Sequence, residues 1–395
     1  MNEILISKKE DKKIICLINN GKLEEFYEEN KDNNRLEGNI YLGIVKDILP
    51  GMQAAFIDIG EEQNAFIHIK DLLPKVSKIT GNKNEDLEKY NINDYIKVNT
   101  PVLVQVKKDK TNLKGAKVST DIHIAGRFIV GLPKDNFITV SQKIEDEKER
   151  NRLKEIVIKN TNNEIGIIVR TAAEGKDEET LKKDIENVMN KWQNIKNECK
   201  KETKKPKVIH KSSSIVEKIL LDTVDNGIEK IIVDNEEEKS KILAILDDIY
   251  GKSNIEVVFK NTENLLDMYD IDDQIEKAKQ RKVWLKCGGF ITIDKTEALT
   301  AIDVNSGKFI GKQNLEQTVL KVNKEASIEI AKQLRLRDIG GIIIIDYIDM
   351  QESESREKVL ETLKEELKKD RSKTQIIEFT KLNLLELTRK HMFSE

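Results

Sequence analysis

Two carboxylates and one amide carry the chemistry that this sequence suggests most directly. Asp303 and Asn305 stand two residues apart in an apolar segment, so they share one face if that segment is a β-strand. Asp346 follows 43 residues later, directly after the four isoleucines 342–345. Oxygen donors of this kind suit Mg²⁺, and a carboxylate at the end of an apolar strand is costly to bury without a cation or a hydrogen-bond donor.

Each aspartate taken alone has a plainer explanation, because Asp commonly ends strands and forms turns. The three residues together favour a metal site, since ligands gather outside the carboxyl ends of strands in open α/β sheets. Asp349 and Glu297 fit either supporting groups of that site or ordinary surface carboxylates. The four histidines are dispersed and predict no histidine cluster: His68, His123, His210 and His391.

A second group of residues could bind a polyanion. Phe56 and Phe66 lie in consecutive strand-like runs, and exposed rings on a small barrel stack on nucleobases. Residues 101–127 hold six basic side chains, Lys108 and Lys114 among them, against two acidic ones, an excess suited to a phosphate backbone. The plainer alternative is that both rings belong to the core and that the lysines are solvated, and from pattern alone we prefer the core explanation for the two rings.

A third signal is the dipeptide of Arg170 and Thr171 at the end of a predicted strand. A guanidinium and a hydroxyl together can bind a terminal phosphate, with the guanidinium contributing two parallel hydrogen bonds. An isolated arginine is more often a surface residue, so this signal is weak by itself.

Composition limits the class of protein. The chain has 395 residues, more than one hydrophobic core usually serves, and a net charge of −3, so any nucleic-acid binding must rest on local positive charge. We find no secretory signal and no apolar run of about 18 residues, and therefore expect a cytoplasmic protein without a membrane segment. The cysteines form no Cys-x-x-Cys pair, which indicates reduced thiols: Cys16, Cys199 and Cys287.

Apolar periodicity predicts the elements that position these residues. Short runs punctuated by glycine between residues 38 and 106 predict a small barrel, with a polar loop or short helix inserted at 77–94. Further strands are predicted at 3–7, 13–18, 128–140, 164–170 and 230–233, and helices at 143–159 and 177–200. From residue 281 onward we predict a hairpin at 283–293, strands at 298–304 and 342–345, helices at 315–330 and 352–369, and a last strand at 375–379.

Two long segments resemble the signatures of the ribonuclease E/G family. Residues 296–307 read TEALTAIDVNSG, and residues 333–350 read QLRLRDIGGIIIIDYIDM. Shorter matches at 38–43, 54–60 and 65–68 resemble the S1 RNA-binding domain of that family. The matches at 114–116, 125–126 and 169–172 extend the resemblance over nearly the whole chain.

The resemblance implies an α+β multidomain fold with an RNase H-like subdomain, an inserted S1 (OB-fold) barrel and 5′-sensor, and a DNase I-like α/β subdomain. The implied boundaries are residues 1–35 for the first part of the RNase H-like subdomain, 36–125 for the S1 domain, 126–214 for the 5′-sensor region, 215–278 for the second RNase H-like part and 279–395 for the DNase I-like catalytic subdomain.

By motif position, the resemblance implies that Asp303 and Asp346 bind Mg²⁺ and that Asn305 positions the reacting groups. It also assigns RNA contacts to Phe56, Phe66, Lys108 and Lys114, which reverses the preference for the core explanation. A pocket for a 5′-monophosphate would involve Gly126, Val130, Arg170 and Thr171.

The activity implied is Mg²⁺-dependent hydrolysis of single-stranded RNA, such as rRNA precursors or mRNA, to 5′-phosphate and 3′-hydroxyl ends. Substrates with a 5′-monophosphate would be favoured, in RNA processing and decay. The alternative is a non-catalytic RNA-binding or ribosome-assembly factor with the same fold. Family members commonly continue into a Cys-x-x-Cys zinc link, which is absent before Glu395, so we expect no zinc-linked dimer and leave a homodimer open.

Overall fold

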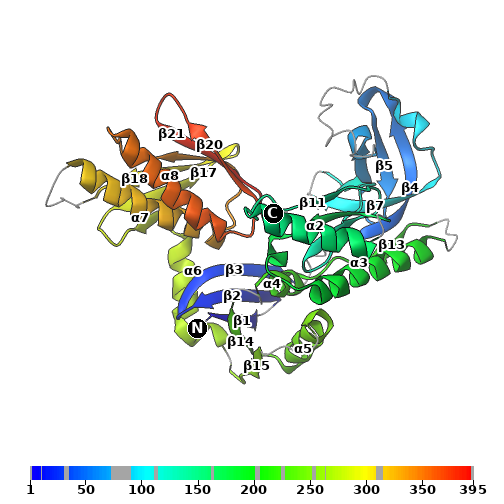
Figure 1. Ribbon diagram of the computed structural model, residues 1–395, viewed down its shortest axis with the longest axis horizontal. Helices are drawn as coiled ribbons and strands as arrows, with labels where there is room; N and C mark the ends of the chain where they lie inside the picture. The colour runs from blue at the N-terminus through cyan, green and yellow to red at the C-terminus, as the bar shows by residue number, and fades with distance from the viewer. Residues whose placement is uncertain are drawn as a thin grey trace. The chain divides into compact units, whose positions relative to one another are not determined.

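The computed structural model describes most of the chain and divides it into two compact units. The residues described are 2–9, 11–30, 35–72, 90–110, 114–161, 164–200, 205–223, 227–250, 255–262, 264–307 and 315–392. Residues 1–33 and 226–395 form the first unit, and residues 34–225 form the second (Figure 1). Most of the predicted insertion at 77–94 lies outside the described residues, and its end forms the short 3₁₀ turn Ile92–Asp94.

The second unit contains the predicted barrel. Its strands follow the order β4 (Ile40–Leu49), β5 (Ala54–Asp58), β6 (Ala65–His68), β8 (Lys117–Ser119) and β7 (Pro101–Lys108). Pairing of β4 with β7 closes the barrel. Strand β13 (Lys207–His210) also pairs with β4, in the antiparallel direction. A Cβ atom at Gly115 would meet the carbonyl oxygen of Asn64 at 2.0 Å, so this close backbone approach requires glycine.

The remainder of the second unit is a small sheet with two helices. The strands run in the order β11 (Ile138–Val140), β12 (Gly166–Val169), β10 (Ile129–Leu132) and β9 (Ile124–Ala125). The prediction of one strand over 128–140 is wrong, because a turn in which Asp135 N–H donates to the Leu132 carbonyl separates β10 from β11. The two predicted helices are α2 (Glu147–Thr161) and α3 (Glu178–Cys199), and the apolar stripe of α3 packs into the core of this region.

The first unit begins with a sheet assembled from distant parts of the chain. Its strands run in the order β15 (Glu256–Phe259), β14 (Ile228–Val233), β1 (Asn2–Lys9), β2 (Lys12–Asn19) and β3 (Lys22–Asn30). Strand β1 pairs in parallel with β14, more than 200 residues later in the chain. The helices of this part of the first unit are α5 (Glu236–Tyr250) and α6 (Ile271–Lys279), whereas α4 (Ile215–Thr223) belongs to the second unit.

The second sheet of the first unit carries the candidate catalytic residues. Its strands run in the order β16 (Lys282–Trp284), β17 (Phe290–Lys295), β18 (Leu299–Asn305), β19 (Gly341–Asp346), β21 (Leu384–Arg389) and β20 (Thr374–Phe379). The prediction that 375–379 is the last strand is wrong, because β21 follows it and lies between β19 and β20.

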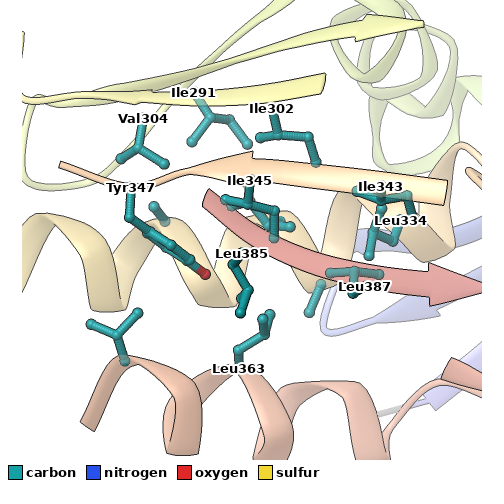
Figure 2. Packing of buried hydrophobic residues seen from close by; sticks show 14 of the residues in the cluster. Ile291, Ile302, Val304, Leu334, Ile343, Ile345, Tyr347, Leu363, Leu385 and Leu387 are labelled. Atoms are coloured by element: carbon teal, nitrogen blue, oxygen red, sulfur yellow. The ribbon is translucent and has the colours of Figure 1, made fainter. Parts of the chain in front are cut away.

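Helices α7 (Leu315–Leu336) and α8 (Ser353–Lys368) pack against one face of this sheet. Alternate strand residues such as Ile302, Ile343 and Leu385 gather with Leu334 and Leu363 between the strands and the two helices (Figure 2). The intervening residues on the other face are accessible to solvent, and Ile342 is 52% exposed. We refer to that second face as the open face of the sheet.

Candidate active site

Asp303 and Asp346 meet on neighbouring parallel strands. Asp303 in β18 and Asp346 in β19 are paired in register, which sets their backbones about 4.8 Å apart. Both are exposed, whereas the residues on either side of each are buried. Because side chains alternate along a strand, both carboxylates project from the open face.

Asn305 lies on the same face and holds one of the two carboxylates. Its side-chain amide donates a hydrogen bond to Asp303 Oδ2 at 2.5 Å. Since only the nitrogen of an amide can donate, this hydrogen bond does not use the amide oxygen of Asn305, which is an acceptor. The spacing of two residues noted in the sequence therefore produces a direct contact as well as a shared face.

The electrostatics of the pair indicate a preference for a cation. Desolvation raises the pKa of Asp346 above its ordinary value, and the negative charges of Asp303 and Asp349 raise it further. The two negative charges repel each other, and a bound cation would offset that repulsion. Asp349 thus contributes electrostatically, whereas Glu297 is exposed and stays a sequence-based candidate only.

The donor set fits Mg²⁺ better than zinc. In the part of the chain that the structure describes, no group of three or more His, Cys, Asp or Glu side chains is arranged to hold a metal ion. Structural and catalytic zinc sites use three or four protein ligands, whereas Mg²⁺ is commonly held by one or two carboxylates together with waters and substrate phosphates. Two carboxylates beside an amide oxygen are consistent with the second arrangement.

The barrel brings the two predicted phenylalanines together. Phe56 in β5 and Phe66 in β6 are directly paired. Their ring centroids lie 6.1 Å apart, and their ring planes meet at 66° in an edge-to-face arrangement. Both rings are half-buried and neither belongs to the buried barrel core. Lys117 of β8 is paired with Phe66 of β6 on one side and with Lys108 of β7 on the other. Aromatic and basic residues therefore lie next to one another across these strands.

Three of the four predicted sensor residues come together in the second unit. The Arg170 guanidinium donates to the carbonyl oxygens of Gly126 and Arg127, each at 3.2 Å. The Thr171 hydroxyl lies 3.0 Å from the Ser141 hydroxyl. Val130 is half-buried on β10, opposite Ile168 of β12.

Asp184 was not identified from the sequence. Its carboxylate accepts hydrogen bonds from the backbone N–H groups of Arg127, Phe128 and Ile129 at 2.9, 2.7 and 3.1 Å. A Cβ atom at Gly126 would lie 2.7 Å from both oxygens of this carboxylate, so glycine there permits the contact. A lone acidic residue on the apolar side of the predicted helix at 177–200 was the signal that could have revealed it.

None of the described helices combines the length and apolar character needed to cross a membrane.

Comparison with known proteins places the chain in a family. The model of the Ribonuclease E/G family matches residues 123–392, and the model of the S1 RNA binding domain matches residues 36–120. The chain is 37% identical over 389 residues to Ribonuclease G of Salmonella typhimurium, which covers 98% of this chain and 79% of that protein. Ribonuclease G of Haemophilus influenzae gives the same figures, and Ribonuclease E of a Nostoc species is 36% identical over 358 residues, 89% of this chain and 51% of the relative. The chain therefore belongs to the ribonuclease E/G family, with an S1 RNA-binding domain and the activity of an endoribonuclease.

Proposed function

We propose that the chain hydrolyses single-stranded RNA with Mg²⁺ held by Asp303 and Asp346, leaving 5′-phosphate and 3′-hydroxyl ends. The observation that carries the proposal is the in-register pairing of the two aspartates on β18 and β19. The bound ion would supply Lewis-acid polarisation of the scissile phosphate and a more acidic water. No histidine lies among the groups assigned to the reaction, so the proposal requires no histidine base.

Three side chains of the open face would hold the metal ion and orient the reacting groups. Asp303 and Asp346 supply negative charge at one point of the open face, and the hydrogen bond from Asn305 fixes the orientation of Asp303. A ligand oriented in this way loses less freedom on binding than an unrestrained side chain would. The amide oxygen of Asn305 can accept a hydrogen bond from a water directed at the phosphate.

The S1 barrel would hold the single strand. Phe56 and Phe66 offer ring surface to unstacked bases, while Lys108, Lys114 and Lys117 attract phosphates. Binding of this kind tolerates many sequences, which suits an enzyme of RNA processing and decay acting on rRNA precursors or mRNA in the cytoplasm.

A preference for 5′-monophosphorylated substrates is the finer part of the proposal. The backbone carbonyls that receive the Arg170 guanidinium hold it in place beside Thr171. A guanidinium fixed in this way pairs well with a phosphate dianion, and the Thr171 hydroxyl can add one hydrogen bond.

The deciding experiment is cleavage of a single-stranded A/U-rich oligonucleotide, with a 5′-phosphate or a 5′-hydroxyl, in Mg²⁺ and in EDTA. Asp303→Asn and Asp346→Asn are expected to lose cleavage and keep RNA binding. Glu386→Gln is the matched control, because Glu386 lies on the same face in β21, opposite Ile344. Equal rates for wild type and either Asn variant would remove the metal assignment, and Mg²⁺-independent binding without cleavage by wild type would favour the non-catalytic RNA-binding factor.

A further inference from the structure

The open face of the catalytic sheet carries an aromatic pair that the proposed mechanism does not use. Trp284 in β16 and Phe290 in β17 are directly paired. Their ring centroids lie 5.3 Å apart, and their ring planes meet at 62° in an edge-to-face arrangement. Trp284 is 62% exposed, although indole surface is among the most costly to leave in water. The neighbouring residue Val283 packs against the buried core instead, so the alternation of β16 places the indole on the open face.

Strand register brings this pair next to the carboxylates. Phe290 is paired with Asn305, and Thr292, two residues further along β17, is paired with Asp303. Trp284 therefore lies two residues along and two strands across from Asp303, a span of about 12 Å, and three strands across from Asp346, a span of about 16 Å. At about 3.4 Å per nucleotide along a stacked strand, these spans correspond to roughly three to five nucleotides.

A positive charge completes the surface. The Lys282 ammonium lies 4.1 Å from the centroid of the Trp284 ring and 3.6 Å from that of Phe290. Lys282 is itself exposed, and it is paired with Thr292 in the same row of the sheet as Asp303 and Asp346. An ammonium held over aromatic faces can contact a phosphate while the rings contact a base.

We propose that Trp284, Phe290 and Lys282 form a stacking platform that binds one base of the RNA strand, within about five nucleotides of the phosphate held at Asp303 and Asp346. This proposal deepens the proposed function and rests on it. A nucleotide suits the platform better than an apolar protein segment, because it presents a planar ring to the indole and an anion to Lys282. A second copy of the chain is the competing occupant, and the test includes it.

The first test measures kcat/KM on a series of oligonucleotides in which one base at a time near the cut site is absent. For wild type, one position is expected to lower kcat/KM by about 5- to 150-fold, the usual range for one stacked base. Trp284→Ala should lower kcat/KM on the intact substrate by a similar factor and show no further loss at that position. Trp284→Phe, which keeps a ring, should recover most of the activity, and Lys282→Gln should raise KM more than it lowers kcat.

A second test reports the platform without any cleavage. The chain has two tryptophans, so in Trp192→Phe protein the fluorescence of Trp284 alone should be quenched by the intact oligonucleotide in EDTA. The oligonucleotide that lacks the sensitive base should not quench it. If wild type fails to cleave RNA while quenching persists, the nuclease proposal fails and the platform stands.

Three results would overturn the platform. The first is a Trp284→Ala enzyme with the wild-type kcat/KM on the intact substrate. The second is a Trp284→Ala enzyme whose kcat/KM still falls as in wild type when the sensitive base is absent. The third is a concentration-dependent dimer in sedimentation that Trp284→Ala converts to monomer, which would assign the indole to a second copy. Thermal unfolding of Trp284→Ala at the wild-type temperature serves as the folding control, because the side chain lies largely outside the core.

Discussion

Replacing Asp346 by asparagine is expected to stabilise the metal-free protein at neutral pH and to abolish cleavage. The pKa of Asp346 is raised by desolvation and by the charges of Asp303 and Asp349. A raised pKa in the folded state means that the native protein binds this proton more tightly than the unfolded chain does. The free energy of unfolding therefore decreases as the pH rises through the ordinary to the raised pKa, and a neutral amide removes that loss.

The strand pairing sets the size of the effect. Two unit charges about 5 Å apart repel by roughly 0.8 kcal/mol in bulk water and roughly 3 kcal/mol at an effective dielectric constant of 20. Asp346 is exposed, so solvent screening favours the lower value. We expect Asp346→Asn to raise the free energy of unfolding in EDTA at pH 7 by about 0.5–1 kcal/mol.

In the presence of Mg²⁺, wild type should become more stable than Asp346→Asn, the reverse of the order in EDTA. At a concentration ten times its dissociation constant, an ion that binds only the folded state stabilises it by about 1.4 kcal/mol. Wild type should gain this amount, and Asp346→Asn should gain much less. The assay is unfolding of the full chain by urea at pH 7 and at pH 4, in EDTA and in MgCl₂, beside the cleavage assay.

The stabilisation by the variant in EDTA should shrink between pH 7 and pH 4, where the carboxyl becomes protonated in wild type. Glu386→Gln should show no dependence on Mg²⁺ beyond that of wild type. A variant that is less stable than wild type in EDTA at pH 7, or that Mg²⁺ stabilises as strongly as wild type, would refute the reasoning.

Three further outcomes are expected. Lys108→Ala should weaken binding of single-stranded RNA and reduce the slope of log K against log salt concentration by about 0.7, measured by fluorescence anisotropy, if this exposed ammonium contacts one phosphate. Arg170→Gln should bring kcat/KM on a 5′-monophosphorylated substrate down to the value on the 5′-hydroxyl substrate, which itself stays unchanged; a preserved preference would exclude this arginine as sensor. Leu385→Ala, at a fully buried position between α8 and the sheet, should cost about 2–5 kcal/mol in urea unfolding, against less than about 0.5 kcal/mol for Glu386→Gln.

The sequence was most informative where local pattern and position coincide. Asp303 and Asn305 were identified from their spacing of two residues, and Asp346 from its place at the end of a predicted strand. The structure brings all three together on one face. The sequence could not provide the register between β18 and β19, because a shift of two residues would satisfy the same alternation. A continuous apolar run such as 342–345 is typical of a strand buried on both faces, but helices cover one face only, and Ile342 is largely exposed.

Strand β3 was missed because its burial depends on a distant partner. Along it, Leu23, Glu25 and Tyr27 are all buried, and the acidic residue in the middle disguises the alternation. Glu25 can be buried because Arg371, some 350 residues away, forms an ion pair with it. Strand β21 was missed for a related reason, since its buried Arg389 is neutralised by Asp370 and Asp338.

The pairing of β1 with β14 has a consequence for synthesis on the ribosome. About 200 residues separate the end of β3 from β14, so at 5–20 residues per second the nascent β1 waits roughly 10–40 seconds for its parallel neighbour. During that time one edge of the β1–β3 meander, which contains Ile4 and Ile6, is open to wrong pairing. The segment between β3 and β14 need not wait for β14, because its last strand, β13, pairs with its first strand, β4. This segment can therefore finish folding while the sheet that contains β1 is still incomplete.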